Sequence, residues 1–319
     1  MNDYYKKIAI IGAGSYGTAI AQCFSVKSGE ILLVSDSVSI EESINARSNS
    51  VSACLNGNIS CTTDFSRISD ADIIFFAIPV SAVADVCDQL KGQYPEKPVV
   101  LCSKGLDIIH ARLISDLVQE LIPNDIAVFS GPSFAHEVIQ GLPFGVNIAS
   151  PRRVLAEDIA VHLSHANFVL KPLNDYIGLQ IAGALKNILA VGCGIFSGLN
   201  LGNNAAAQLM VGGLQEMICL TIAMGGQKDT FLELGGVGDT ILTCTSQQSR
   251  NVLFGEHLAN GGCIDNWNGN LAEGAFSAKA IPAFERKFQL NLRIFHWIYD
   301  VIYEAKQPSS VEVSKLCDQ

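Results

Sequence analysis

The 319-residue sequence has few charged residues, no block of basic residues and no Cys-x-x-Cys pair. Charged residues make up 16% of the chain and leave a formal net charge of −10, which argues against general nucleic-acid binding. The ten cysteines are scattered, and no His/Cys cluster has the spacing of a zinc site. We therefore expect reduced thiols, no bound metal and a cytoplasmic protein.

The chain also lacks a long apolar run that is free of charge. Its most apolar long segment, 177–199, contains Lys186 and Asn187 near its centre. A lysine in the middle of a bilayer is costly, so we expect a buried core helix and no membrane span. The chain enters a strand-like run almost at its first residue, so we also expect no signal peptide.

Residues 7–19, KIAIIGAGSYGTA, join an apolar run to a G-x-G-x-x-G motif and the start of a helix. In such a loop Gly12 permits the tight turn, Gly14 lets backbone amides approach a diphosphate, and Gly17 lets the helix pack close to the strand. Asp36 ends the next apolar run, where an acidic residue can bind ribose hydroxyls. The pattern predicts a dinucleotide-binding site; the alternative is a purely structural glycine turn.

The first half of the chain alternates short apolar runs with helix-like segments. Apolar runs occur at 72–78, 98–102, 126–130, 144–149 and 167–170, and helical patterns at 81–91 and 111–121. This alternation predicts an α/β Rossmann domain with a mostly parallel sheet over residues 1–173. Helical patterns at 176–196, 205–224, 249–260, 278–288 and 294–303 predict an all-α domain over residues 174–319.

Two lysines and one aspartate are candidates for chemistry. Lys104 directly follows an apolar run, a position that points toward a cleft, although a surface lysine is the plain alternative. Lys186 lies in a helix that is apolar nearly all round, where burial lowers its pKa toward the range useful for acid/base work. Its alternative is a lysine that snorkels out of the core. Asp239 ends a Gly-rich loop and either takes part in chemistry or caps a helix.

Further polar residues stand at loops and predicted helix starts. Arg250 suits bidentate contacts with phosphate, and its neighbours Ser249 and Asn251 add hydrogen-bonding groups. Glu273 could reach a ribose or an amide, but an exposed loop carboxylate explains it equally well. His136 follows the GPSFA run and is one further candidate for a chemical role.

Seven motifs occur in one order: GAGSYGTA at 12–19, SKG at 103–105, GPSFAHE at 131–137, ALKN at 184–187, GGVGD at 235–239, LTCT at 242–245 and QSRN at 248–251. Together they resemble the bacterial-type NAD(P)-dependent glycerol-3-phosphate dehydrogenases over about residues 7–290. The resemblance implies reversible reduction of dihydroxyacetone phosphate to sn-glycerol 3-phosphate, for glycerophospholipid synthesis. It also implies a helical domain like the C-terminal domain of 6-phosphogluconate dehydrogenase, a small phosphorylated substrate and a possible homodimer.

The resemblance assigns roles to residues of this chain. Lys186 would be the general acid/base for the substrate, with Lys104 and Asp239 as further catalytic residues. The implied substrate-binding positions are Lys104, Gly131, Ser133, Lys186, Asp239, Ser249, Arg250 and Asn251. The implied cofactor positions are Gly12, Gly14, Ser15, Tyr16, Gly17, Asp36, Lys104, Ala135, Arg250, Leu271 and Glu273.

The chain departs from the family pattern at Asp36, at Gly212 together with Ala205–Ala207, which stand where basic residues are usual, and over 49–64, which is short. Asp36 stands where many members carry Arg or His, and because a carboxylate repels a 2′-phosphate we expect NADH to be preferred over NADPH. Gly212 replaces the Arg of the family's ITRGLxE segment, which leaves a catalytically decayed dinucleotide sensor as one alternative. The other alternative is a related two-domain dehydrogenase acting on a β-hydroxyacid or a ketopantoate-like substrate.

Overall fold

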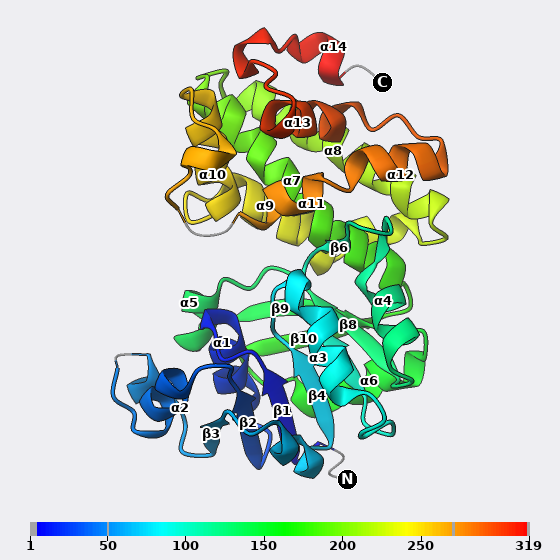
Figure 1. Cartoon of the computed structure of the whole chain (residues 1–319). Coiled ribbons are helices and arrows are strands. Elements are labelled where there is room, and N and C mark those ends of the chain that lie inside the picture. The colour runs from blue at the N-terminus through cyan, green and yellow to red at the C-terminus, as the bar shows by residue number, and fades with distance from the viewer. Residues whose placement is uncertain (1–4, 50, 270–271, 318–319) are drawn as a thin grey trace. The chain divides into compact units, whose positions relative to one another are not determined.

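Eight strands pair into one sheet in the computed structural model, which describes residues 5–49, 51–269 and 272–317 (Figure 1). Their order across the sheet is β10-β9-β8-β5-β4-β1-β2-β3. β1, β2 and β4 are nearly continuous apolar runs, as expected for strands that are covered on both faces. The strands are β1 (Lys7–Ile11), β2 (Glu30–Val34), β3 (Ile59–Thr62), β4 (Ile73–Phe76), β5 (Val99–Leu101), β8 (Ile126–Ser130), β9 (Phe144–Ala149) and β10 (Phe168–Leu173).

Six of these strands run parallel, so their carboxyl ends lie at one edge of the sheet. β1 lies between β2 and β4, β3 continues beyond β2, and β5 and β8 continue beyond β4. β9 is antiparallel to β8 and parallel to β10. The strand order reverses at β1, which is where open α/β sheets bind ligands. The predicted class, a mostly parallel sheet followed by helices, is confirmed.

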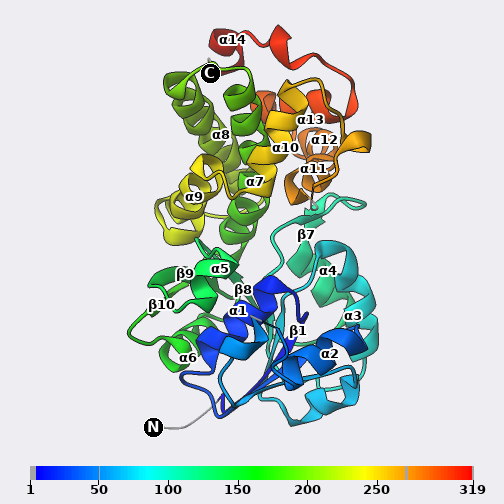
Figure 2. The same cartoon turned by 90° about the vertical axis from the view of Figure 1, so that its left-hand side faces the viewer.

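Helices cover both faces of this sheet. Ile8 and Ile10 of β1 pack with Phe24 of α1 in one buried cluster, to which α5 and α6 also contribute. Successive strand residues point to opposite faces, and Figure 2 shows α6 on one side of the sheet and α3 and α4 on the other. These helices are α1 (Ser15–Phe24), α2 (Val38–Asn45), α3 (Val83–Leu90), α4 (Ile114–Leu121), α5 (Ala135–Ile139) and α6 (Arg153–Leu163).

The rest of the chain is helical and surrounds α7 (Tyr176–Gly198), in which every residue from Gly178 to Phe196 is buried. By length and composition alone, α7 and α8 could each cross a membrane. The most apolar stretch of α7 is wholly buried, as in a core helix of a soluble protein, whereas that of α8 is 39% buried. The other helices are α8 (Asn203–Ala223), α9 (Asp239–Thr245), α10 (Arg250–Ala259), α11 (Glu273–Ala278), α12 (Ile281–Phe288), α13 (Arg293–Tyr303) and α14 (Val313–Cys317).

The chain folds into two units, each of which packs mainly within itself. The sheet unit comprises the residues up to Ser103 together with Ser115–Tyr176, and the helical unit comprises Lys104–Ile114 together with the residues from Ile177 on. Segment 104–114 forms a hairpin of β6 (Leu106–Asp107) and β7 (Arg112–Leu113). The helix predicted from residue 111 therefore begins only at 114, because residues 112 and 113 pair with the preceding strand.

Candidate active site

The glycines between β1 and α1 lie where a side chain would change the loop. Gly12 has a φ of +106°, which residues with a side chain rarely adopt, and its N–H donates to Val34 O over 2.9 Å. A Cβ on Gly17 would lie 1.8 Å from Gly12 O, so α1, which begins at Ser15, packs directly on the loop. A Cβ on Gly14 would find no other atom within 4 Å, which leaves this backbone open. The loop therefore fits a dinucleotide diphosphate.

Other predicted ligand positions lie at the same carboxyl edge of the sheet. Tyr16 Oη lies 3.0 Å from Ser133 Oγ, which also donates to Gly131 O over 3.0 Å. Ala135 begins α5, which packs on α1. Asp36 follows β2, the strand beside β1, and its side chain is exposed. The carboxylate oxygens of Asp36 are thus accessible to a ligand next to the glycine loop.

Two lysines of the helical unit share one buried carboxylate. Lys186 Nζ donates to Asp239 Oδ1 over 2.7 Å, and Lys104 Nζ donates to Asp239 Oδ2 over 2.8 Å. Asp239 is 1% exposed and Lys186 is 5% exposed. One carboxylate cannot neutralise two ammonium groups, so this cluster attracts an anion. The fold thus brings together the three residues that the sequence identified separately.

A hydroxyl group that the sequence analysis missed completes the cluster. Lys186 Nζ also donates to Thr243 Oγ1 over 2.6 Å, and Thr243 Oγ1 donates to the backbone O of Asp239 over 2.7 Å. Asp239 and Thr243 lie one turn apart on α9, so they present both groups to the same lysine. The spacing from the Asp of GGVGD to the first Thr of LTCT, one helical turn, was the sequence signal that pointed to Thr243.

The surroundings of Lys186 lower its pKa to about 8. Burial is the main cause, since it disfavours the charged form, and the ammonium group of Lys104 acts in the same direction. The Asp239 carboxylate acts in the opposite direction and limits the change. Lys186 can therefore exchange a proton near neutral pH, as a general acid or base must.

A close-packed turn before α9 aims Asp239 at the lysines. Leu234–Gly238 forms one π-helical turn, in which Gly236 has non-helical angles of φ −90° and ψ −107°. A Cβ on Gly236 would lie 2.5 Å from both Thr230 O and Phe231 Cα, so a side chain does not fit there. Both carboxylate oxygens of Asp239 bind lysines, and the residue at the helix cap is Gly238.

Two asparagines link α7 to the start of α11. Asn251 Nδ2 donates to Asn187 Oδ1 over 3.1 Å, and Gly274 N donates to Asn251 Oδ1 over 2.9 Å. Asn187 Nδ2 reaches Glu273 Oε2 at 3.4 Å. Glu273 therefore lies within one hydrogen bond of the residue that follows Lys186. The amide of Asn251 is largely used inside the protein, and its substrate-binding role stays a prediction.

The remaining predicted positions differ in what surrounds them. Ser249 caps α10, since its Oγ accepts a hydrogen bond from Val252 N at 3.5 Å. Arg250 is exposed and pairs with no carboxylate in the described part of the chain, which leaves its guanidinium available to an anion. His136 is exposed beside Glu137. Leu271 lies outside the described residues.

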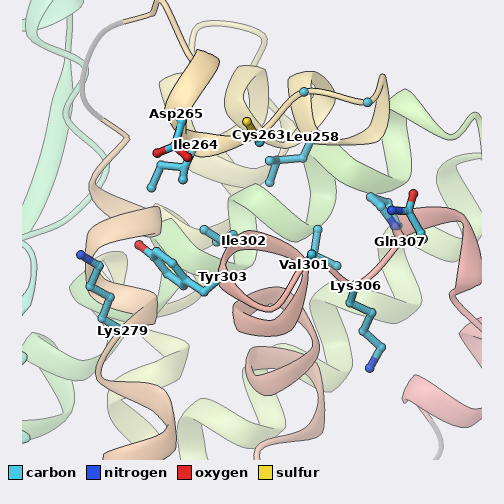
Figure 3. A pocket seen from close by; sticks show the side chains of 14 residues that line it. Leu258, Cys263, Ile264, Asp265, Lys279, Val301, Ile302, Tyr303, Lys306 and Gln307 are labelled. Atoms are coloured by element: carbon cyan, nitrogen blue, oxygen red, sulfur yellow. The ribbon is translucent and has the colours of Figure 1, made fainter.

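Other features of the described residues lie apart from this cluster. The described residues include no group of three or more His, Cys, Asp or Glu side chains that could hold a metal ion, and the nine cysteines whose side chains are described form no disulfide with one another. A cavity of about 650 Å³ in the helical unit is lined by Leu258, Val301 and Tyr303, among others, and by no predicted site residue (Figure 3). We assign no ligand to it.

Comparison with known proteins gives the chain its relatives. The family models for the N-terminus and the C-terminus of NAD-dependent glycerol-3-phosphate dehydrogenase match residues 7–156 and 175–312, respectively. The glycerol-3-phosphate dehydrogenase (NAD(P)+) of Parvibaculum lavamentivorans is 36% identical over 299 residues, which cover 91% of this chain and 90% of that protein. This chain belongs to the glycerol-3-phosphate dehydrogenase family. The glycerol-3-phosphate dehydrogenase (NAD(P)+) of Agrobacterium fabrum is 39% identical over 281 residues, which cover 86% of this chain and 85% of that protein.

Solved structures of glycerol-3-phosphate dehydrogenases agree with this assignment. The enzyme from Coxiella burnetii has a TM-score of 0.91 at 30% identity and covers 99% of this chain and 100% of its own. The enzyme from Saccharomyces cerevisiae has a TM-score of 0.85 at 25% identity, with coverages of 98% and 99%. The resemblance inferred from the motifs is confirmed, and so is an NAD(P) cofactor.

The Gly212 departure from the glycerol-3-phosphate dehydrogenase pattern lies where α8 packs on α13. A Cβ on Gly212 of α8 would lie 2.6 Å from Ile294 Cδ1 at the start of α13. One turn later, Glu216 accepts hydrogen bonds from Ile294 N at 2.8 Å and Phe295 N at 3.2 Å. Burial raises the pKa of Glu216 to about 7. Gly212 thus lies at the contact between α8 and α13, where a Cβ would displace the end of the Ile294 side chain.

Proposed function

We propose that the protein catalyses the reversible reduction of dihydroxyacetone phosphate to sn-glycerol 3-phosphate, which supplies glycerophospholipid synthesis. The observation that carries the proposal is the sharing of Asp239 by Lys186 and Lys104. It places a proton donor with a pKa of about 8 beside excess positive charge. A phosphorylated ketone needs both features, since its carbonyl oxygen takes up a proton and its phosphate is an anion.

Each residue of the cluster has its part in this reaction. A nicotinamide cofactor, held at the loop of Gly12, Gly14 and Gly17, would supply the hydride that reduces the ketone. Lys186 donates a proton from Nζ to the C2 oxygen as negative charge develops there, and it takes up a proton from solvent afterwards. Asp239 and Thr243 hold that Nζ by hydrogen bonds throughout. Lys104 and Arg250 attract the anionic substrate, with Gly131, Ser133, Ser249 and Asn251 as the further predicted substrate positions.

The cofactor proposal is that NADH is preferred over NADPH. Its support is the exposed carboxylate of Asp36 beside the glycine loop, where it can accept hydrogen bonds from both ribose hydroxyls but repels a 2′-phosphate. The kcat/KM values for the two cofactors measure this preference. A tenfold advantage of NADPH would overturn it, and Asp36→Ser should raise the relative rate with NADPH.

The test of the reaction is an assay of the purified protein with dihydroxyacetone phosphate and each reduced cofactor. We expect loss of NADH absorbance and formation of sn-glycerol 3-phosphate. Ketopantoate and 2-oxo acids serve as competing substrates, and faster turnover of these would favour a related two-domain dehydrogenase. NADH binding without any turnover would favour a dinucleotide sensor and sink the enzymatic proposal.

We also propose that the protein is a cytoplasmic homodimer without a membrane span. In each copy, residues 1–173 would form the cofactor-binding domain and residues 174–319 the helical substrate domain. The α8 helix supports the dimer: its only charged residue, Glu216, is buried, while Val211 and Ile222 are 56% and 55% exposed. An uncharged exposed helix face is suited to a second copy of the chain. Light scattering should give a dimer mass that Val211→Glu reduces to a monomer. A monomeric wild type would contradict the dimer.

A further inference from the structure

The hairpin that follows Lys104 packs in the helical unit, although it lies between two strands of the sheet in sequence. Leu106, Ala111 and Leu113 are 1%, 5% and 2% exposed and belong to the same apolar cluster as the core of α7. Leu106 is only two residues from Lys104, whose Nζ binds Asp239. The hairpin therefore limits where the Lys104 ammonium group can lie.

A buried carboxylate organises the loop of this hairpin. Asp107 is 6% exposed, and its Oδ1 accepts hydrogen bonds from Ile109 N at 3.1 Å and His110 N at 3.3 Å. Its Oδ2 lies 2.8 Å from His110 Nδ1 and accepts a hydrogen bond from Arg112 Nε at 2.8 Å. Because one side chain binds both the turn and the returning strand, its loss would loosen the whole loop.

A lysine from α12 holds the far end of the same loop. Ala111 has a φ of +47°, a left-handed conformation that costs a residue with a side chain about 1 kcal/mol. Lys287 Nζ donates to Ala111 O over 3.0 Å. Among the described residues Lys287 has no carboxylate partner, so its ammonium group is committed to this backbone carbonyl.

We propose that Asp107 and Lys287 are positioning residues that act through Lys104. By fixing the hairpin to the helical unit, they hold the Lys104 ammonium group on Asp239, ready for the substrate's anionic group. The inference rests on the proposed function for its catalytic consequence. Its structural half, the restraint of Lys104, does not depend on that function.

Amine labelling followed by mass spectrometry tests the restraint without any assay of activity. The Lys104 side chain is 16% exposed and bonded to Asp239, so it should react slowly with an amine-directed ester. We expect Lys287→Met and Asp107→Asn each to speed the labelling of Lys104 severalfold. Lys287→Arg, which keeps a positive donor at this position, should keep the slow wild-type rate. Lys279→Met is the matched control, because Lys279 lies over the Phe276 and Tyr303 rings and not on the hairpin. Unchanged labelling of Lys104 in both variants overturns the proposal.

A double-mutant cycle tests the catalytic consequence. We expect Lys287→Met to lower kcat/KM for dihydroxyacetone phosphate about fivefold, the loss of one hydrogen bond, with the Kd for NADH unchanged. In a Lys104→Met background the same change should have no further effect. Equal losses in both backgrounds, or a lower melting temperature with unchanged labelling, mean a merely structural role and overturn the inference. If the wild type has no activity, the proposed function fails, and the labelling result still decides the positioning.

Discussion

Two glycine-rich turns precede helices in this protein, and Gly14 of the first and Gly236 of the second serve opposite purposes. In the loop before α1, a Cβ on Gly14 would meet nothing within 4 Å, so bare backbone is left open. In the turn before α9, a Cβ on Gly236 would lie 2.5 Å from two backbone atoms, so the chain is packed against itself. The first turn offers N–H groups to a ligand, whereas the second presents the side chain of Asp239.

This difference explains why one continuous motif predicts the first site, whereas the residues of the second could be identified only one by one. A backbone cradle needs little more than glycines at a fixed spacing after a strand, so its motif predicts it. A side-chain cluster needs partners from distant segments. Lys104 lies 135 positions before Asp239 and Lys186 lies 53 before it. Only the fold brings such residues together.

The largest effect should follow removal of the proton donor that the second turn serves. We expect Lys186→Met to lower kcat for dihydroxyacetone phosphate reduction about 10³-fold, as the loss of a general acid does. The Kd for NADH, measured by fluorescence titration, should stay unchanged because the glycine loop is intact. Lys279→Met makes the same change on a lysine outside the cluster and should keep wild-type kcat. A Lys186→Met protein with most of its kcat would refute the proton-transfer role.

A smaller effect should follow from adding one methyl group to the second turn. Gly236→Ala places a Cβ against backbone that cannot move aside, which should cost about 2 kcal/mol of stability. Because the turn aims Asp239, we also expect kcat to fall about tenfold. Urea unfolding and steady-state kinetics measure the two quantities. Wild-type stability in this variant would show that the turn is not close-packed.

A methyl group added at Gly14 of the first turn should weaken cofactor binding and leave the stability of the protein unchanged. Gly14→Ala meets no neighbouring atom, so the free energy of unfolding without cofactor should stay within about 0.5 kcal/mol of the wild type. The KM for NADH should rise about tenfold, because the added Cβ meets the diphosphate. If instead Gly14→Ala unfolds the protein and Gly236→Ala does not, the contrast between the two turns is wrong.

The sequence analysis predicted elements that stand out as continuous apolar runs, and it missed several others, among them α6 and the β6–β7 hairpin. The strands at 126–130 and 144–149 and the buried helix around Lys186 were predicted, because each is an apolar run that polar or turn residues interrupt or bound. The β6–β7 hairpin was missed, since strands of two residues show no alternation and Ala111 gives no sign of its left-handed turn.

The side chains of the candidate site were predicted less completely than its backbone. Lys186 was identifiable because a lysine in an apolar helix needs a partner or a shifted pKa. Thr243 was missed, because it bonds its own helix backbone just as Thr245 does, and only the contact with Lys186 from another helix distinguishes the two. The substrate role of Ser249 stays a prediction, and the structure adds that its hydroxyl group caps α10. Such choices depend on neighbours from other segments.

The smallest effect should be a shift in the pH dependence of the reaction when the hydroxyl group of Thr243 is removed. Lys186, with its pKa lowered to about 8, is protonated below that pH and neutral above it. Reduction needs the protonated form, so kcat/KM for dihydroxyacetone phosphate should be level below pH 8 and fall above it, while oxidation of sn-glycerol 3-phosphate should rise through the same range. Thr243→Val removes an acceptor for the ammonium group and should move both profiles about half a unit lower. Thr245→Val, on the same helix, should leave them in place, and a reduction rate that rises through pH 8 would contradict Lys186 as the acid.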